Sequence, residues 1–254
     1  AKASPLDLAE MANEVLDARR LGEAADRTGA RITVAIDSPA TIDAVVAGGV
    51  REVLIDVDVG LPRCGCLPED AGRLADAARA AGLHVRGVMG YEGHLMGIPD
   101  RTERATGASR SMELLAGAHA EVGGDVVSGG GTGTWDCNDS VTELQAGSYT
   151  LVDTEYGKLG LPFEPALSVL GRVVSTHGAD YAVADVGLKA LGMDHGNPAI
   201  AGGSVWFCSD EHITFAPTAG SMPATVGDVI EVWPAHVDPT VAYHERLVLI
   251  RRPE

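Results

Sequence analysis

Over the first 165 residues, short apolar runs alternate with longer segments of helical character, and this alternation restricts the possible folds more than any other feature. A helix between successive strands makes the strands parallel and the crossovers right-handed. About five or six strands can be recognised, fewer than the eight of a (β/α)8 barrel, so the pattern indicates an open sheet or an N-terminally incomplete barrel. The predicted strands are Ile32–Ile36, Val53–Val59, Val85–Met89 and Asp125–Ser128, and the predicted helices are Leu6–Leu16, Ala40–Ala47, Pro68–Ala81 and Arg104–Ala120.

The pattern changes after Pro165, where short strands follow one another without helices between them. This spacing is typical of an antiparallel β domain. We therefore expect an α/β domain over residues 1–165 and a mostly antiparallel β domain over residues 166–254. The strands predicted in the second domain are Val169–Thr176, Tyr181–Val186, Ser204–Phe207, His212–Phe215, Asp228–Trp233 and Arg246–Ile250.

The net charge restricts the partners of this chain. A formal charge of −17 argues against binding to nucleic acids or anionic membranes, because both require a basic surface. No apolar run approaches the ~20 residues needed to cross a bilayer, and the first residues lack the apolar region of a signal peptide. Cys64 and Cys66 are too close for an ordinary disulfide. We therefore predict a cytoplasmic protein that binds neither nucleic acid nor membrane.

The segment Val126–Thr134 begins as an apolar strand and continues with four glycines and three hydroxyl residues. Glycine lets the backbone curl closely around a ligand, and convergent N–H groups with Ser and Thr hydroxyls suit a phosphate. The segment has neither the lysine of a P-loop nor the Gly-x-Gly-x-x-Gly pattern of dinucleotide-binding proteins. A flexible loop is the alternative. Its position directly after a strand, where α/β folds place their ligands, favours phosphate binding.

Three further strand ends carry polar side chains that could reach a ligand at the same edge of the sheet. Arg63 follows one strand and could donate to an oxyanion, although a surface arginine is the commoner interpretation. Tyr91 and His94 follow the next strand. Tyr156 lies after the strand-like segment Ser148–Val152 and could reach a phosphate, although a buried aromatic residue is an equally good interpretation by itself.

The β domain contains His236 and Asp238, two residues apart in a segment that is expected to be extended. In an extended chain both side chains point to one side and could bind one divalent cation. Such a pair is common by chance and needs further ligands or water. One nitrogen and one carboxylate favour Mn²⁺ or Mg²⁺, although Zn²⁺ is possible.

Taken in order, six motifs resemble the D-threonine aldolase family, which is related to the D-serine dehydratases. They are Gly60-Leu61-Pro62-Arg63-Cys64-Gly65, Tyr91-Glu92-Gly93-His94, Ser128–Thr134, Asp153–Tyr156, Ser209-Asp210-Glu211-His212 and His236-Val237-Asp238. The resemblance covers nearly the whole chain from Ala12 onward. It implies an alanine-racemase-type fold, in which a (β/α)8 barrel precedes a β domain, and a homodimer.

The resemblance also implies pyridoxal 5′-phosphate and a divalent metal as cofactors. Lys2 would hold the pyridoxal phosphate covalently, Arg63 would contact its ring oxygen, and Tyr91 would flank it. His236 and Asp238 would bind the metal. The phosphate would be held by Gly130, Gly131, Thr132 and Tyr156. The implied reaction cleaves a D-β-hydroxy-α-amino acid, such as D-threonine, to glycine and an aldehyde, with Lys2, His236 and Asp238 as the catalytic residues.

Two departures from the family pattern concern Lys2 and the catalytic base. The family places a few dozen residues between its lysine and the segment that resembles Ala12–Val15, and here only Ala3 to Met11 intervene, so we expect segments to be missing near the start. Some members carry a further histidine where this chain has Gly97. The alternative functions are a D-serine or 3-hydroxy-amino-acid dehydratase of the same fold, whose relatives tend to have His-x-Cys at the metal pair, and a non-catalytic pyridoxal-phosphate-binding protein.

Overall fold

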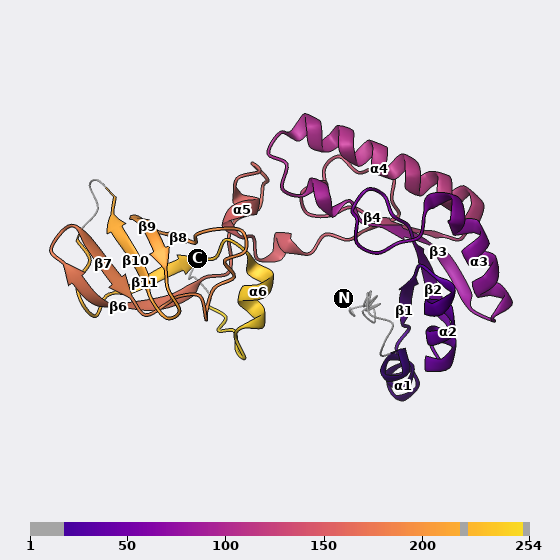
Figure 1. Ribbon diagram of the computed structural model, residues 1–254, viewed down its shortest axis with the longest axis horizontal. Coiled ribbons are helices and arrows are strands. Elements are labelled where there is room, and N and C mark those ends of the chain that lie inside the picture. The colour runs from indigo at the N-terminus through magenta and orange to yellow at the C-terminus, as the bar shows by residue number, and fades with distance from the viewer. Residues whose placement is uncertain (1–17, 219–222, 251–254) are drawn as a thin grey trace, which may run out of the picture. The chain divides into compact units, whose positions relative to one another are not determined.

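The computed structural model describes residues 18–218 and 223–250, and the chain divides into two compact units between Ala146 and Gly147 (Figure 1). The domain boundary predicted at residues 165 and 166 falls inside the second unit and stays a prediction. The predicted helix Leu6–Leu16 and the predicted cofactor lysine, Lys2, lie outside the described residues. Among the helices of the described part, none has the length and apolarity needed to span a membrane.

The first unit contains a five-stranded parallel sheet with the strand order β1-β2-β3-β4-β5. The predicted alternation of strands and helices is confirmed, with boundaries shifted by a few residues and with one additional helix, α1, and one additional short strand, β5. The strands are β1 (Thr33–Ile36), β2 (Glu52–Asp56), β3 (His84–Gly90), β4 (Val126–Gly129) and β5 (Glu143–Leu144). The helices are α1 (Ala18–Thr28), α2 (Pro39–Gly48), α3 (Ala71–Ala80) and α4 (Arg101–Val122), with 3₁₀ turns at Pro68–Asp70 and Gly93–Leu95.

Both faces of the parallel strands are buried, as the apolar runs require. Alternate residues such as Val34, Ile55 and Val88 pack in one core with residues of α2, α3 and α4, which lie on one side of the sheet (Figure 1). The residues between them form a smaller cluster, Ala35, Leu54, Met89 and Val126, on the opposite face. Because all strand pairs of this sheet are parallel, the carboxyl ends of the strands lie at one edge.

The helices begin where the local sequence satisfies their free N–H groups. Ser38 caps α2 in a reciprocal capping box with Thr41, and Pro39 occupies the first turn. The carboxylate of Asp100 accepts the N–H of Glu103 at 2.8 Å at the start of α4. These caps explain why both helices start earlier than the apolar periodicity alone predicts.

The second unit contains a closed antiparallel barrel of six strands in the order β10-β7-β6-β11-β8-β9. The predicted antiparallel β domain is confirmed. Its core includes Val173, Ile213, Phe215 and Val232. The strands are β6 (Val169–His177), β7 (Tyr181–Ala184), β8 (Ala199–Ile200), β9 (Gly203–Cys208), β10 (Ile213–Pro217) and β11 (Val229–Trp233), and the helices are α5 (Thr154–Gly157) and α6 (Val237–Ala242).

Two predicted strands are wrong. Ser148–Val152 contains a 3₁₀ turn, Ser148–Thr150, and Val152 adopts a positive φ of 48°, which no strand allows. Arg246–Ile250 belongs to no strand, and its apolar side chains are exposed. The barrel closes with six earlier strands, which leaves no edge for this segment to extend. In both cases apolar and β-branched residues suggested a strand that the tertiary structure does not form.

Candidate functional site

The carboxyl edge of the parallel sheet carries a buried carboxylate and the loop that contains Arg63. Asp56 ends β2 and is 7% exposed. Burial raises the pKa of Asp56 to about 7, nearby Asp37 adds to the rise, and the charge of Arg63 opposes it. The Asp37 carboxylate also accepts the N–H of Gly65 at 3.4 Å, so it holds the loop that follows Arg63.

The structure brings together three of the residues predicted to bind the cofactor. The guanidinium carbon of Arg63 lies 5.5 Å from the centroid of the Tyr91 ring, at cation–π distance. Gly131 is also close to this ring, because a Cβ at Gly131 would lie 3.0 Å from it. Tyr91 therefore packs against the glycine-rich turn and under Arg63. His94 is exposed, with its ring beside Gly60.

The glycine-rich turn, Gly129–Thr134, begins at the last residue of β4, as the sequence predicts, and is buried. Its first N–H groups donate inside the protein. The N–H of Gly130 donates to Glu92 at 3.0 Å, and the N–H of Gly131 donates to the Thr134 hydroxyl at 3.1 Å. Gly130 has a φ of 75°, and a Cβ there would lie 2.4 Å from Leu144. The backbone conformation at this position therefore favours glycine.

His236 and Asp238 lie at the junction of β11 and α6, and their geometry corrects the prediction of an extended pair. His236 is the extended residue before α6, whereas Asp238 is in the first turn of the helix. The two side chains still meet, with Nε2 of His236 3.3 Å from a carboxylate oxygen of Asp238. The meeting results from a strand-to-helix turn and not from strand alternation.

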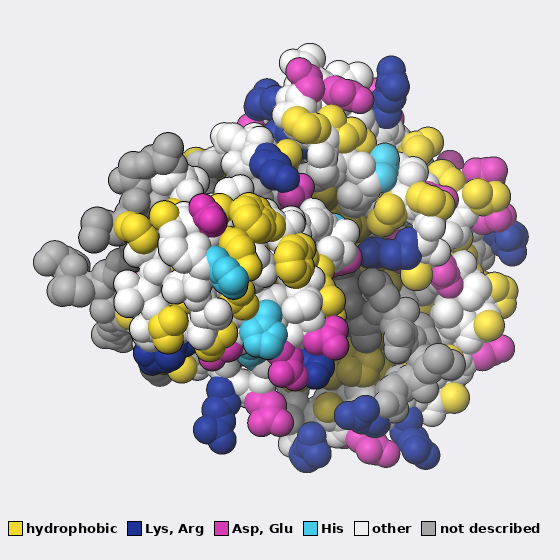
Figure 2. Space-filling view, turned by 60° about the vertical axis from the view of Figure 1, so that its left-hand side comes forward, with side chains coloured by type: hydrophobic (Ala, Val, Ile, Leu, Met, Phe, Trp, Pro, Cys, Tyr) yellow, Lys and Arg dark blue, Asp and Glu magenta, His cyan; other side chains and the backbone are white. Residues whose placement is uncertain are grey.

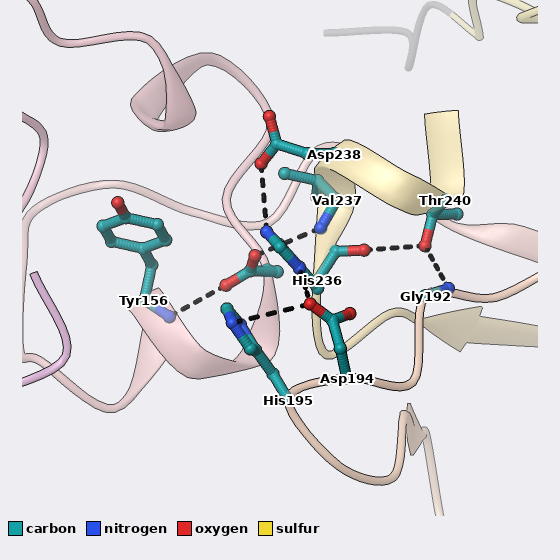
Figure 3. Close-up of polar contacts among 9 residues, drawn as sticks. Tyr156, Gly192, Asp194, His195, His236, Val237, Asp238 and Thr240 are labelled. Atoms are coloured by element: carbon teal, nitrogen blue, oxygen red, sulfur yellow. Dashed lines mark hydrogen bonds and ion pairs between the residues drawn. The ribbon is translucent and has the colours of Figure 1, made fainter. Parts of the chain in front are cut away.

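Two residues that the sequence did not predict complete this group (Figure 3). Asp194 lies in the loop after β7, and its carboxylate is 2.7 Å from Nδ1 of His236. The ring of neighbouring His195 stacks on the ring of His236, with centroids 3.9 Å apart. Ligand atoms of Asp194, His195 and His236 lie within 4.8 Å of one another, a separation suited to one metal ion. We call Asp194, His195, His236 and Asp238 the His236 cluster.

Hydrogen bonds fix the two segments that carry the His236 cluster. The hydroxyl of Thr240 donates to the carbonyl of His236 at 2.7 Å and accepts the N–H of Gly192 at 2.9 Å. The loop that carries Asp194 is therefore tied to the first turn of α6 (Figure 3). Although partial burial acts in the opposite direction, the hydrogen bond from His236 lowers the pKa of Asp194.

Tyr156 belongs to the same unit as the His236 cluster. Asp153 is 1% exposed, and its two carboxylate oxygens accept the N–H of Tyr156 at 2.9 Å and the N–H of Val237 at 3.2 Å. This carboxylate therefore joins α5 to the start of α6 (Figure 3). Burial raises the pKa of Tyr156, and the charges of Asp153 and Asp238 add to the rise, so the phenol stays protonated at neutral pH and can donate a hydrogen bond.

These groups fit the cofactors that the sequence suggested. Glycines, hydroxyl groups and an arginine at the carboxyl edge of a parallel sheet suit a phosphorylated ring compound. Two imidazoles and two carboxylates, three of them largely exposed, suit a divalent cation that keeps water ligands. The individual site assignments stay predictions.

Sequence reasoning missed four residues that organise these sites: Glu92, Arg104, Asp194 and His195. A signal for the last two was present, because Asp194-His195 is flanked by Gly192 and Gly196 in a loop. Glu92 stands within the motif that includes Tyr91, but a carboxylate next to a tyrosine does not by itself indicate a buried acceptor. Arg104 looks like an ordinary surface arginine on a helix until its 1% exposure is known.

Comparisons with known proteins agree with both units. Residues 9–153 match the family model described as alanine racemase, N-terminal domain, and residues 166–250 match the putative serine dehydratase domain. The chain is 35% identical over 246 residues to a D-threonine aldolase from Arthrobacter sp., covering 87% of this chain and 64% of the relative. It is 32% identical over 268 residues to a 3-hydroxy-D-aspartate aldolase from Paracoccus denitrificans, covering 94% and 69%.

The fold comparison gives the same result. The crystal structure of a D-threonine aldolase from Filomicrobium marinum superposes with a TM-score of 0.85 at 31% identity. The match covers 92% of this chain and 69% of that structure. The chain thus spans about two thirds of the length of these relatives.

Proposed function

Because the chain belongs to the D-threonine aldolase family, with the alanine-racemase-type fold, we propose that the whole protein cleaves D-β-hydroxy-α-amino acids to glycine and an aldehyde. This is a carbon–carbon lyase reaction. The observation that carries the proposal is the His236 cluster, in which Nε2 of His236 faces the Asp238 carboxylate at 3.3 Å. A pair of this kind can bind a metal and leave coordination positions open for a substrate hydroxyl.

We assign the pyridoxal phosphate to the edge of the parallel sheet. Lys2 would hold the cofactor covalently, Arg63 would donate to its ring oxygen, and Tyr91 would flank the ring. Gly130, Gly131, Thr132 and Tyr156 would surround the phosphate. The contact between Arg63, Tyr91 and Gly131 supports the assignment, because it places a cation, an aromatic ring and the glycine-rich turn together. When bound, pyridoxal phosphate supplies an electron sink for the electrons of the broken Cα–Cβ bond.

We assign the divalent metal to His236 and Asp238, with Mn²⁺ or Mg²⁺ favoured over Zn²⁺ by the mixed and exposed ligand set. His236 and Asp238 would hold the ion, which when bound would supply Lewis acidity toward the substrate hydroxyl. Asp194 accepts the hydrogen of Nδ1 and thereby holds the His236 ring with Nε2 directed at Asp238. His195 packs flat against the same ring and restricts its rotation.

The main alternative is a dehydratase, which would eliminate the β-hydroxyl as water. The carboxylate of Asp238 favours the aldolase, because the related D-serine dehydratases resemble this chain but tend to have a cysteine there. The aldolase relatives at 35% and 32% identity support the same choice. The β unit and its His236 cluster also argue against a non-catalytic pyridoxal-phosphate-binding protein, which would not need a metal pair.

We also propose a cytoplasmic homodimer. Its support is the exposed apolar surface of the β unit, where hydrophobic side chains reach the solvent (Figure 2). Large apolar side chains on the outside of a barrel are typical of a surface that another chain covers. They include Leu170, Val174, Trp206, Phe207 and Val229, which are 45–58% exposed.

The test is product analysis with the metal-loaded protein and pyridoxal phosphate. D-Threonine should give glycine and acetaldehyde in equal amounts, and D-serine should give no pyruvate. L-Threonine is the control and should not react. Formation of a keto acid and ammonia from the D-amino acids would identify a dehydratase and overturn the proposal. An absorbance scan for a borohydride-reducible band, lost in Lys2→Ala, tests the cofactor assignment separately.

A further inference from the structure

The glycine-rich turn is held from one side by a fully buried carboxylate. Glu92 lies just after β3 and is 0% exposed. One of its oxygens accepts the N–H of Gly130 at 3.0 Å, and the other accepts the Thr134 hydroxyl at 2.8 Å and the side-chain amide of Asn138 at 3.2 Å. A buried charge is tolerated when hydrogen bonds satisfy it, and Glu92 has three donors.

A buried guanidinium holds the same turn at its other end. Arg104 projects from α4 and is 1% exposed. Its Nε donates to the carbonyl of Gly133 at 2.8 Å, and one terminal nitrogen donates to the carbonyls of Ile98 and Pro99. The planar, forked donor set of arginine therefore joins the turn to the segment that precedes α4.

Thr134 links these two ends. Its hydroxyl donates to Glu92 at 2.8 Å and accepts the N–H of Gly131 at 3.1 Å. Gly130 and Gly131 thus both depend on one carboxylate, the first directly and the second through a hydroxyl. These hydrogen bonds within the protein hold the shape of the turn.

The choice of charged residues at two buried positions is informative. The side chain of Glu92 offers acceptors to three donors. One of these donors is the backbone N–H of Gly130, which can only donate. Glutamine of the same shape would turn two donors toward Thr134 and Asn138. Arg104 likewise faces carbonyl acceptors. Glu92 therefore supplies acceptors to this turn, and Arg104 supplies a donor to it.

We propose that Glu92 and Arg104 are positioning residues that preorganise the Gly129–Thr134 turn for the phosphate of the cofactor. The inference rests on the proposed function, because it takes the turn to be the phosphate site. Neither Glu92 nor Arg104 is assigned a contact with the reacting atoms. They act through Gly130, Gly131 and Gly133, whose backbone they fix. A preorganised turn binds its ligand more tightly because it does not lose conformational freedom on binding.

The experiment compares two probes, pyridoxal 5′-phosphate and pyridoxal, which differ only in the phosphate. The full-length protein is freed of cofactor and its binding of each probe is measured by absorbance, in wild type, Glu92→Gln and Arg104→Met. We expect each variant to weaken pyridoxal 5′-phosphate binding roughly tenfold, the equivalent of one or two lost hydrogen bonds, and to leave pyridoxal binding near the wild-type value. The ³¹P resonance of the bound phosphate should shift in both variants.

Two matched controls separate positioning from a general loss of stability. Arg101→Met removes an exposed arginine of the same helix that pairs with Asp136, and Asn138→Ala removes a Glu92 donor outside the turn. Both should keep the wild-type preference for the phosphorylated probe. If Glu92→Gln does not fold, Thr134→Val decides, since it preserves side-chain shape and removes both hydroxyl hydrogen bonds that connect Gly131 to Glu92.

The outcomes are distinct. Wild-type protein that binds both probes equally well lacks a phosphate site, which would refute the proposed function. Wild-type preference for the phosphorylated probe, retained in Arg104→Met and in Glu92→Gln or Thr134→Val, would refute the positioning role alone. Equal weakening of both probes, together with a lower melting temperature, would show that these residues only stabilise the fold.

Discussion

The glycine-rich turn and the His236 cluster differ in the solvent exposure of their polar side chains and in how these side chains are paired. Glu92 and Arg104, which bond to the turn, are 0% and 1% exposed, and the N–H groups of Gly130 and Gly131 donate to protein acceptors. In the His236 cluster the Asp194 and Asp238 side chains are 56% and 75% exposed, and only the His236 ring is largely covered. One region is closed and internally satisfied, whereas the other is open to solvent.

This difference suits two kinds of ligand. A closed network keeps a single geometry and costs little to organise when a permanently held cofactor binds. An open cluster leaves coordination positions to water and substrate, as expected of a catalytic metal that exchanges. The comparison predicts that substitutions in the turn affect cofactor binding and folding, and that substitutions in the cluster affect metal binding and catalysis.

The largest expected effect is on catalysis. His236→Ala and Asp238→Ala should each reduce D-threonine cleavage by more than about a hundredfold, since even outer partners of metal ligands are worth ~10–100-fold. The cofactor absorbance should remain, because Lys2, Arg63 and the turn hold it elsewhere. Steady-state rates and spectra measure both properties. Exposed Asp210→Ala in the same unit is the control. Full cleavage by chelated wild-type protein would mean that the pair is structural.

Gly130→Ala tests the closed region. A Cβ at Gly130 would lie 2.4 Å from Leu144, and the φ of 75° is unfavourable for alanine. We expect the free energy of unfolding to fall by roughly 1–2 kcal/mol, mainly from the left-handed backbone, because the Leu144 side chain is 39% exposed and can move aside. Gly117→Ala, in the exposed part of α4 with open space around it, should instead add up to ~1 kcal/mol. Denaturant unfolding measures both, and similar values would contradict the contrast.

Asp194→Asn sharpens the comparison within the cluster. Asparagine can still accept a hydrogen bond from Nδ1 of His236 but removes the negative charge beside the ring. We expect Mn²⁺ affinity, measured by electron paramagnetic resonance, to fall by about 10–100-fold while the affinity for pyridoxal 5′-phosphate is unchanged. Unaltered Mn²⁺ binding would remove Asp194 from the metal site.

The smallest effect concerns Asp56, the buried carboxylate near Arg63. Its pKa of about 7 lies above the ordinary value of 3.8, so the folded state binds the proton more tightly than the unfolded chain. Asp56 should therefore destabilise the protein increasingly as pH rises from about 4 to about 7. Asp56→Asn should raise the melting temperature by a few degrees at pH 8 and leave it unchanged near pH 4. Exposed Asp139→Asn should show no such dependence, and a parallel shift at both pH values would contradict the assignment.

The sequence by itself determined the order of the elements and most of the chemistry-bearing positions. Apolar runs separated by helical segments can bury both faces only as a parallel sheet, so β1 to β4 and α2 to α4 were predictable. The six strands of the barrel were partly predictable, because five of the predicted segments overlap them and β8, with two residues, carries too little pattern. The placement of Arg63, Tyr91 and the glycine-rich turn at one edge followed from the direction of parallel strands.

Only the tertiary structure decided how distant side chains pair. His236 meets Asp194 across 42 positions of sequence, and Arg104 meets Gly133 across 29, so no local pattern could indicate either contact. The turn between β11 and α6 differs from the predicted extended segment because Asp153, 84 positions away, accepts the N–H of Val237 and so holds the start of α6. Burial also decides the role of Arg104. It would be a solvated charge on an isolated helix, and it becomes a fixed donor once α4 packs against the glycine-rich turn.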